Sequence, residues 1–599
     1  MSFGAYREEQ REGLADMIRP RERLNVWEWA ARHVDLSRVP SYDTPYHEPY
    51  DPDIFPMWKE VVEGLTDPQV REIAVVKATR LGASENLVLN TIGYCVSERP
   101  QPILYLTGDQ VTAERFLDKR VRRRLRAARR TADALREAQV SKHEIAFRNM
   151  DFRVNWPRSK LAFKQDGWAL VLCDETSVWP EYATDMARRR VDSYPFPHIL
   201  FISSPDPMQK RGSDADPIFQ EWERGDKREW FCPDPAGGDF QFEMGSKDGA
   251  GLHWDESAKR EDGTWDLRKV RESAHYVTPG GAVIQNHDRM RIARAGRWVA
   301  TATDTAAPGC RSYRLNSFHS PFAAGDFGSL AVAFLKAQAT PGGMRTFAYE
   351  YLAEKYYQKK AALNDDELIE RQREYAMGSL SAAPILHKTG KGWVFVTVDV
   401  QKGHLWYVAR EWWPGGDSAL LDWGYAVEWQ MIEAVATKFG AYRVFPDIGY
   451  EERAIEVCEY AMEAKAVPLR GSPSLKYLPV QEVEINPWEG RRRGGAEDQR
   501  IMTYTFNSDM FSTHLAALMS GQSRHVWALP KDTPMAYVNQ ANSEECVDGV
   551  WKTKKGRPNN HIRDCEKMQV VAAFIHGLYR ILPPEAAEGE PQMDANGRE

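Results

Sequence analysis

Short runs of apolar residues alternate with polar, helix-like stretches in the first third of the chain. The apolar runs lie at 73–76, 102–106, 168–175 and 198–204. The first helix-like stretch, 85–94, follows the first run directly. Nearly continuous apolar runs are typical of strands buried on both faces, and their alternation with helices indicates a mainly parallel sheet. The sequence therefore predicts an α/β fold for this region.

The pattern changes beyond this region. Residues 206–320 show weak periodicity, 325–375 read as helical, and a second α/β pattern opens at 393–399 and runs to about 580. The end of the chain is acidic and poor in apolar residues, which favours disorder. We therefore expect an N-terminal segment, an α/β domain with an irregular insertion, a helical linker, a second α/β domain and a disordered tail, at 1–60, 61–325 (insertion at about 206–320), 326–385, 386–582 and 583–599.

Composition excludes several classes of protein. The chain has 599 residues and a formal net charge of −7, so its overall charge does not indicate nucleic-acid binding. There is no apolar run of about 18 residues and no apolar segment after the charged N-terminus, so we expect neither a membrane span nor a secretory signal. The seven cysteines are scattered without a CxxC pair, which argues against a disulfide framework or a closed zinc site.

A loop with the features of a phosphate-binding loop follows the first apolar run. Such a loop needs inward-facing backbone N–H groups, a glycine, a cation and a hydroxyl for Mg²⁺. Here these groups come from Lys77, Thr79, Arg80, Gly82, Ala83 and Ser84. Ala83 stands where a lysine usually precedes the hydroxyl, and Lys77 lies at the front of the loop instead. A strand, turn and helix with one glycine is common, so this signal is weak alone.

Two further strand ends strengthen the interpretation. The run at 168–175 ends in the paired carboxylates Asp174 and Glu175, and in P-loop ATPases the first such acid contacts the Mg²⁺ shell while the second polarises the attacking water. The run at 198–204 ends in Ser203 and Ser204, which suit a γ-phosphate sensor that couples hydrolysis to movement. Each feature alone also fits an ordinary strand end. Together they predict an ATPase that binds ATP and Mg²⁺.

Three aspartates in the second α/β region follow another pattern. Asp399 and Asp447 end strand-like runs, and Asp564 lies near the start of a helix-like stretch. An RNase H-like nuclease places acids on elements of these kinds to hold two Mg²⁺ or Mn²⁺ ions about 4 Å apart. Carboxylate oxygens suit such hard cations. Each aspartate alone is ordinary, because strand ends and helix starts favour Asp, but the ordered set predicts a mixed-sheet nuclease domain.

Clustered cations are the candidate DNA contacts. The stretch 119–130 holds eight Lys or Arg residues, and smaller clusters lie at 491–493 and 552–557. Phosphate binding through them would be independent of sequence and sensitive to salt. A solvated helix face explains the first cluster equally well. For the arginines at 188–190, a solvated face is favoured over an arginine finger.

With these motifs in place, the chain resembles the large subunit of tailed-phage DNA-packaging terminases, closest to the lambda-like branch, over roughly residues 25–580. That branch places its loop lysine at the front, as Lys77 is here, and Asp174, Glu175, Ser203 and Ser204 match its ATPase motifs. Asp399, Asp447 and Asp564 fall where its nuclease acids fall. The resemblance is looser around Tyr42 and Tyr46, which would supply adenine contacts.

The resemblance implies an ASCE-type P-loop ATPase that drives double-stranded DNA into a procapsid and a nuclease that cuts concatemers. It implies a small terminase subunit and a portal as partners, a ring on the portal, and the host cytoplasm as location. Members of the branch often carry paired cysteines in the insertion; here Cys232 has no such pair, so we expect no structural zinc. Three alternatives stay open: a helicase-nuclease, a transposase-like enzyme, or a packaging scaffold with a degenerate ATPase.

Overall fold

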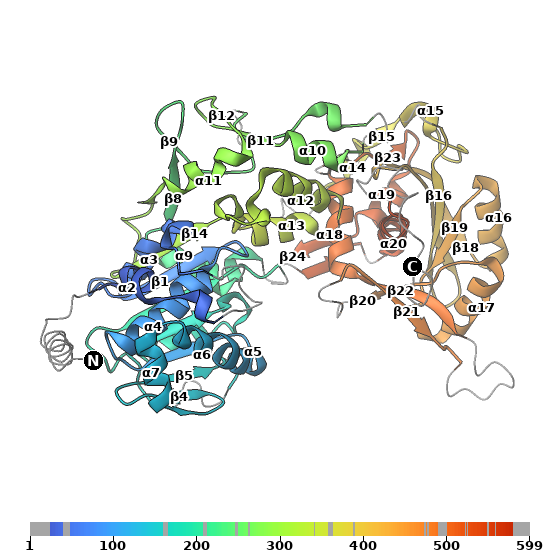
Figure 1. The fold of residues 1–599 in the computed structure, drawn as a ribbon. Coiled ribbons are helices and arrows are strands. Elements are labelled where there is room, and N and C mark those ends of the chain that lie inside the picture. The colour runs from blue at the N-terminus through green and yellow to red at the C-terminus, as the bar shows by residue number, and fades with distance from the viewer. Residues whose placement is uncertain are drawn as a thin grey trace, which may run out of the picture.

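The computed structural model places two sheets in separate lobes (Figure 1). It describes residues 24–39, 48–159, 166–207, 212–245, 249–260, 264–340, 342–356, 363–386, 390–472, 475, 478–488, 500–521, 523, 525–547, 550–557 and 559–578. Tyr42, Tyr46, the basic cluster at 491–493 and the predicted disordered tail lie outside these residues. No described helix is long and apolar enough to cross a membrane.

The first lobe is built on a sheet that has eleven strands among the described residues, in the order β13-β8-β14-β1-β7-β6-β2-β5-β4-β3, with β9 beside β8. The central strands from β8 to β5 run parallel, and the antiparallel pairs lie at the two edges. This confirms the predicted mainly parallel sheet. The strands are β1 (Glu72–Lys77), β2 (Ile103–Leu106), β3 (Gln139–Val140), β4 (Glu144–Ala146), β5 (Asp151–Asn155), β6 (Leu170–Asp174), β7 (His198–Ser203), β8 (Arg228–Pro233), β9 (Asp239–Phe240), β13 (Arg297–Ala300) and β14 (Cys310–Leu315).

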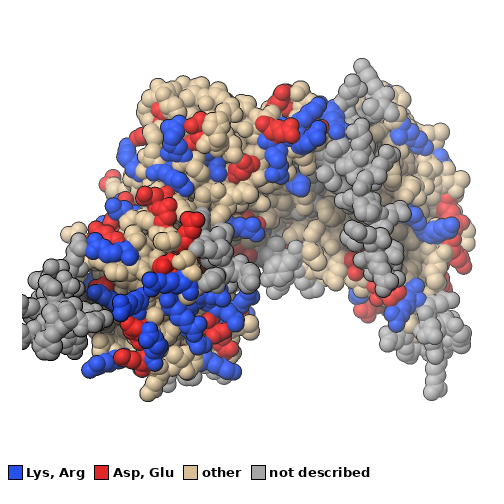
Figure 2. All heavy atoms as spheres, in the orientation of Figure 1, with Lys and Arg blue, Asp and Glu red and all other residues tan. Residues whose placement is uncertain are grey.

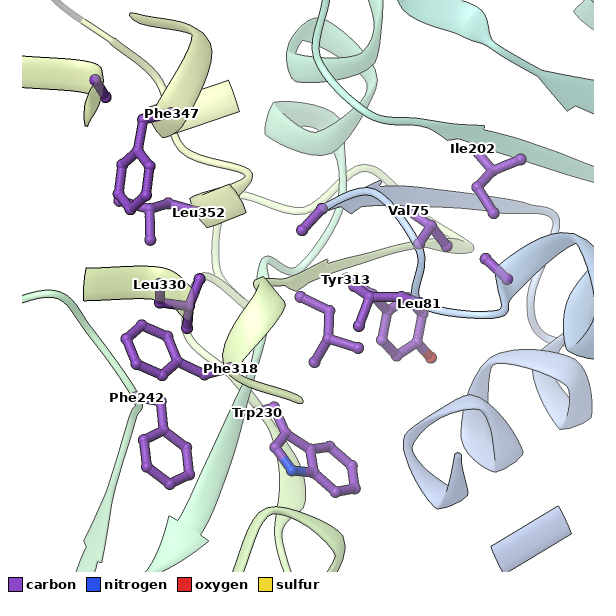
Figure 3. Close-up of a cluster of buried hydrophobic side chains, with 14 of the residues drawn as sticks. Val75, Leu81, Ile202, Trp230, Phe242, Tyr313, Phe318, Leu330, Phe347 and Leu352 are labelled. Carbon is purple, nitrogen blue, oxygen red and sulfur yellow. The ribbon is translucent and has the colours of Figure 1, made fainter. Parts of the chain in front are cut away.

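Helices cover both faces of this sheet, which explains the unbroken apolar runs. Val75 belongs to a core cluster that includes residues of α2 and α4, whereas its neighbour Val76 belongs to a cluster with residues of α8 and α9. Successive side chains of a strand point to opposite faces, so both must be apolar when both faces are buried. Figure 3 shows Val75 and Ile202 in the first cluster. The helices are α2 (Val26–His33), α3 (Lys59–Gly64), α4 (Asn90–Ser97), α5 (Gln110–Arg115), α6 (Arg122–Arg126), α7 (Arg129–Glu137), α8 (Ala183–Arg188) and α9 (Pro217–Arg224).

Part of the expected insertion at 206–320 belongs to the main sheet, because β8, β13 and β14 join it. The pattern of apolar residues does not predict these strands because they carry charged residues that pair across strands. Glu229 of β8 lies in register with Arg314 of β14, and the two form an ion pair at 2.8 Å. The described part of the segment also contains a small three-stranded sheet and the helices α10 and α11 near it: β10 (Gly251–His253), β11 (His275–Val277), β12 (Val283–Ile284), α10 (Leu267–Ser273) and α11 (Asn286–Arg294).

The segment between the lobes is less helical than the sequence suggests. Helices α12 (Phe327–Ala339) and α13 (Gly343–Phe347) lie between the two sheets (Figure 1). The next turn, Ala348–Leu352, ends at Ala353, whose φ of 54° breaks the helix. Among the described residues that follow, the elements are short, namely α14 (Asp365–Ile369), β15 (Gln372–Arg373) and α15 (Ala383–Leu386).

The second lobe is a mixed six-stranded sheet in the order β15-β23-β18-β17-β16-β19, as counted over the described residues. Its central pairs β16/β17 and β17/β18 are antiparallel, and β16/β19 is parallel, which confirms the predicted mixed sheet. Its strands are β16 (Trp393–Val400), β17 (Leu405–Trp412), β18 (Ser418–Ala426), β19 (Arg443–Pro446), β23 (Trp527–Pro530) and β15.

Helices flank this sheet too. Phe395 of β16 shares a core cluster with residues of α20, while Val396 shares one with residues of α16 and α17. The helices are α16 (Trp429–Phe439), α17 (Ala454–Ala464), α18 (Ser508–Met519), α19 (Met535–Ala541) and α20 (His561–Ile575). Smaller sheets are formed by β20 (Leu469–Ser472), β21 (Val480–Ile485) and β22 (Ile501–Asn507), and by β24 (Glu544–Val547) and β25 (Val550–Thr553).

Candidate functional site

The carboxyl-terminal edge of the parallel sheet gathers the N-terminal candidate residues. Strand β7 lies between β1 and β6, and all three run in the same direction. Their last residues, Lys77, Ser203 and Asp174, therefore lie at one edge of the sheet. In open α/β folds this edge is where ligands bind.

The loop after β1 is held in a fixed shape. Arg80 and Gly82 have φ angles of 58° and 68°, in the left-handed region. A Cβ on Gly82 would lie 2.7 Å from the ring of Phe55, so glycine is required both by backbone and by space. The Leu81 carbonyl accepts from Trp58 Nε1 at 2.8 Å, and the Thr79 N–H donates to the Glu350 carbonyl at 2.9 Å.

Lys77 and Ser84 stand at the two ends of this loop. Lys77 ends β1, and Ser84 begins a turn of π-helix, Ser84–Leu89, that runs into α4. Ala83, beside Ser84, is buried. The helix start supplies backbone N–H groups, and the hydroxyl of Ser84 lies where the chain leaves the loop.

Lys77 is the cation that faces the paired acids. Its Nζ donates to Ser204 Oγ at 3.2 Å. Burial lowers the pKa of Lys77, while the carboxylates of Asp174 and Glu175 oppose that shift. Arg80 is exposed instead. The structure thus brings Lys77, Ser204, Asp174 and Glu175 together at this edge of the sheet.

The two acids have different surroundings. Asp174 Oδ2 accepts from the Tyr105 hydroxyl at 2.9 Å, and its Oδ1 accepts the Glu175 N–H at 2.9 Å. Glu175 has a left-handed backbone, with φ 54°, and its carboxylate accepts from Thr107 Oγ1 at 3.3 Å. Burial, and then the charge of Asp174, raise the pKa of Glu175. A carboxylate of raised pKa is better suited to accept a proton than an ordinary one.

Ser203, the last residue of β7, links that strand to the turn that follows Glu175. Its Oγ donates to the Ser204 carbonyl at 2.7 Å and accepts the Ser177 N–H at 3.2 Å. Behind this contact, the buried Asp216 accepts the backbone N–H groups of Asp206 and Ile218. A displacement of the β7 end would therefore reach the acid-bearing turn directly.

Two arginines of the basic stretch support the loop helix rather than the surface. Arg120 and Arg124 both pair with Glu85, the residue after Ser84, and the Arg120 contact is 2.8 Å. Arg124 is buried and also donates to Asn90 at 2.8 Å. Exposed cations within and next to this stretch contribute to a basic surface on the lobe of α5, α6 and α7 (Figure 2). They are Arg115, Lys119, Arg126, Arg129, Arg130 and Arg136.

Arg188 lies away from the nucleotide edge. It pairs with Glu221 and, at 3.0 Å, with Glu72, which begins β1 at the opposite end from Lys77. Its contacts are those of a structural ion-pair network. In the cluster at 552–557, Lys554 donates to the Leu363 carbonyl at 2.7 Å and Arg557 pairs with Asp365 at 2.6 Å, so these two cations tie the lobe to the linker.

In the second lobe the three candidate aspartates come from neighbouring elements. Asp399 is on β16, Asp447 directly follows the neighbouring β19, and its N–H donates to the Val398 carbonyl at 2.8 Å. Asp564 is in the first turn of α20, which packs on β16. Burial, and then the charges of Asp399 and Asp564, raise the pKa of Asp447 to about 7. The carboxyls are therefore close enough to repel one another.

Each carboxylate is also engaged by the protein. Asp399 Oδ2 accepts from Gln401 Nε2 and contacts His561 Nδ1, both at 2.8 Å. Asp564 Oδ1 pairs with Lys567 Nζ at 2.8 Å, and burial raises the pKa of Asp564. In this arrangement no group of three His, Cys, Asp or Glu residues among those described is disposed to hold a metal ion.

The chemistry of the donors suits divalent metal, although their side chains do not surround one ion in this arrangement. Asp399 is buried and Asp447 and Asp564 are partly buried; the three carboxylates repel one another, and a divalent cation would remove that repulsion. Sequence reasoning missed three neighbours of the set: His561, Lys567 and Glu544, whose charge also acts on Asp564. His561 and Lys567 lie within three residues of Asp564, so helical spacing could have suggested them; nothing local points to Glu544.

Comparison with solved structures finds phage large terminases at low similarity. The large terminase of HK97 bacteriophage has 11% identity and a TM-score of 0.33, covering 92% of this chain and 99% of that chain. The large terminase of a thermophilic bacteriophage has 8% identity and a TM-score of 0.33, covering 87% of this chain and 98% of that chain. No curated protein matches the chain.

The family models are decisive. Residues 46–298 match the ATPase domain of the phage terminase large subunit gpA, and residues 310–582 match the endonuclease domain of the same family. The first match contains the sheet edge with Lys77 and Asp174, and the second contains Asp399, Asp447 and Asp564. Such domains use nucleotide, divalent metal and DNA. The chain therefore belongs to the phage terminase large subunit gpA family, whose ATPase and endonuclease domains package and cut DNA.

Proposed function

We propose that ATP is hydrolysed at the edge formed by β1, β7 and β6. Lys77 contacts the phosphates, the loop from Thr79 to Ala83 surrounds them with backbone N–H groups, and Glu175 orients and deprotonates the attacking water. Ser84 and Asp174 would hold Mg²⁺, which supplies charge neutralisation at the phosphates when bound. The contact of the Lys77 ammonium with Ser204 Oγ at 3.2 Å, where it also faces the charges of Asp174 and Glu175, is the observation that carries this proposal.

The same contact supports Lys77 over Arg80 as the phosphate cation. Lys77 is half-buried and donates to the hydroxyl of Ser204, whereas Arg80 is exposed. Lys77→Ala is expected to abolish ATP hydrolysis, and Arg80→Ala is expected to reduce it by less than tenfold. Equal losses in the two variants would contradict this assignment.

Coupling would run through Ser203 and Ser204. Ser204 contacts Lys77, and Ser203 contacts the N–H of Ser177 in the turn after Glu175. Loss of γ-phosphate changes the charge opposite Lys77, and the two serines are positioned to pass that change to the acid-bearing turn. We infer that Ser203→Ala separates ATP hydrolysis from DNA movement.

We propose that Asp399, Asp447 and Asp564 form the nuclease centre. The three would hold two Mg²⁺ ions, with Mn²⁺ as a substitute, and bound metal would supply an activated water and stabilise the leaving oxygen. The chain's own part is to set the carboxylates on three rigid elements, β16, the end of β19 and α20, and to orient Asp399 through His561.

At the level of the whole protein, we propose the division expected from the sequence: an ATPase region at 61–325, a linker at 326–385 and a nuclease region at 386–582. The two separate sheets support it. We further propose that the chain works as a ring on a portal, receives double-stranded DNA from a small terminase subunit, and acts in the host cytoplasm. Co-purification with each partner tests these associations.

A crossed assay tests the two-site proposal. Glu175→Ala is expected to lower DNA-stimulated ATP hydrolysis by about 10²- to 10⁴-fold and to leave Mg²⁺-dependent plasmid nicking unchanged, and Asp399→Ala is expected to do the reverse. Glu181→Ala, an exposed acid near Glu175, is the matched control and should change neither activity. If each active-site variant lost both activities while remaining folded, the two-site proposal would fail.

A further inference from the structure

A row of aromatic side chains extends from the proposed nuclease centre across the sheet. Asp399 of β16 lies in register with Trp406 of β17, and Trp406 lies in register with Tyr425 of β18. Residues directly opposite one another on paired strands project to the same face. The row therefore starts at the carboxylate of Asp399 and ends at Tyr425, whose side chain is 47% exposed.

Ring contacts hold this row together. Trp406 lies parallel to His561, with 5.7 Å between centroids and 8° between planes, and His561 Nδ1 contacts Asp399 at 2.8 Å. The Tyr425 ring lies 5.5 Å from that of Trp406 and 5.1 Å from that of His404. The exposed Tyr425 ring therefore packs against the rings of Trp406 and His404. The ring of His561 connects Trp406 to the Asp399 carboxylate.

The distance along the row matches a short piece of DNA strand. Adjacent strands of a sheet are about 4.8 Å apart, so Tyr425 lies roughly 10 Å from Asp399 across two spacings. This is about three nucleotide rises at 3.4 Å each. The exposed Lys402 is in the turn that joins β16 to β17, three residues after Asp399.

The aromatic character of the row indicates which ligand it would bind. Aromatic side chains bind nucleic acid by stacking on bases, but a base inside a duplex already has both faces covered. We propose that Tyr425, backed by His404 and Trp406, stacks an unpaired base of the strand held at the three aspartates, so that the nuclease cuts DNA best where it is unpaired within about three nucleotides of the cut. This inference rests on the proposed nuclease centre.

Cleavage of two duplexes tests it. The full chain is incubated with Mg²⁺ and either a fully paired duplex or the same duplex with a three-base mismatch, and cuts are mapped at nucleotide resolution. The wild type is expected to cut the mismatched duplex at least tenfold better in kcat/KM, within about three nucleotides of the mismatch. Tyr425→Ala is expected to lose about tenfold on that duplex, through KM, because stacking has this strength. Tyr425→Phe, which keeps the ring, should behave as the wild type.

The outcomes separate this inference from the assignment of the centre. If Asp399→Asn still cuts, the proposed nuclease centre is wrong. If Asp399→Asn is inactive but Tyr425→Ala equals the wild type, or loses activity equally on both duplexes, only the stacking proposal is wrong. A wild type without preference for the mismatch would also overturn it. Thermal unfolding of the Tyr425 variants, expected to match the wild type, checks that neither has lost its fold.

Discussion

Replacing Arg410 by Met would remove one partner of a fully buried ion pair in the nuclease lobe. Arg410 Nε lies 3.0 Å from Glu566 Oε2, and both side chains are 0% exposed. Arg410 also donates to Ser418 Oγ at 3.2 Å and to the Ala528 carbonyl at 3.3 Å. Glu566 lies two residues after Asp564 on α20, so the pair fixes the helix that carries a proposed metal ligand.

The loss of unfolding free energy depends on the donors that remain around Glu566. Breaking a buried pair by removing one partner costs about 3 to 5 kcal/mol, because the other charge is left buried. Two donors would still reach Glu566: the Tyr537 hydroxyl at 2.5 Å and Trp527 Nε1 at 3.2 Å. We therefore expect about 3 kcal/mol for Arg410→Met. The double variant Arg410→Met with Glu566→Gln should recover at least about 1 kcal/mol, since no buried charge is left.

Urea unfolding followed by a probe in the nuclease lobe measures this loss, and ATP hydrolysis and plasmid nicking are measured on the same protein. The expected result is a lower unfolding midpoint for the nuclease lobe, weaker nicking, and unchanged ATP hydrolysis. A loss of less than about 1 kcal/mol in the single variant would refute the reasoning, as would a double variant less stable than the single one.

Three further predictions concern the ATPase lobe. Gly82→Ala should abolish ATP hydrolysis but spare nicking, because the loop needs a positive φ and has no room for a Cβ; steady-state assays of both activities check this. Tyr105→Phe should lower kcat for ATP hydrolysis about tenfold, because Asp174 would lose the hydrogen bond from the Tyr105 hydroxyl, and an unchanged kcat would show that this hydrogen bond is not needed. Burial raises the pKa of Asp216 to about 6, so folding takes up a proton and the free energy of unfolding should fall as pH rises from about 4 to 6. Asp216→Ser, which keeps a helix-capping oxygen, should remove that slope in chemical denaturation at several pH values, and a slope that persisted would refute the assignment.

The sequence predicted the parts of the fold that local patterns encode. The buried strand before Lys77, the strands ending at Asp174 and Ser203, and the three aspartates were all visible because strand ends and apolar runs are local. The charged strands β8 and β14 were not recognised, because Glu229 and Arg314 stabilise each other only when the chain brings them together.

Long-range contacts also limit how much of the candidate sites the sequence can predict. Nothing local in the stretch 119–130 shows that Arg120 and Arg124 pair with Glu85 instead of facing DNA. The same holds for His561 and Asp399, which are distant in sequence and meet only because α20 packs on β16. Residue type and spacing suggest chemistry, whereas which cation meets which acid is decided by the tertiary fold.

We propose that one chain carries two separate metal-dependent centres. Anomalous diffraction from crystals of the full chain, grown with Mn²⁺ and a non-hydrolysable ATP analogue, tests it most directly. Manganese is expected among Asp399, Asp447 and Asp564, and a separate manganese is expected beside Asp174 and Ser84. Absence of manganese from the three aspartates while the nucleotide site is filled, or nucleotide bound away from Lys77, would contradict it.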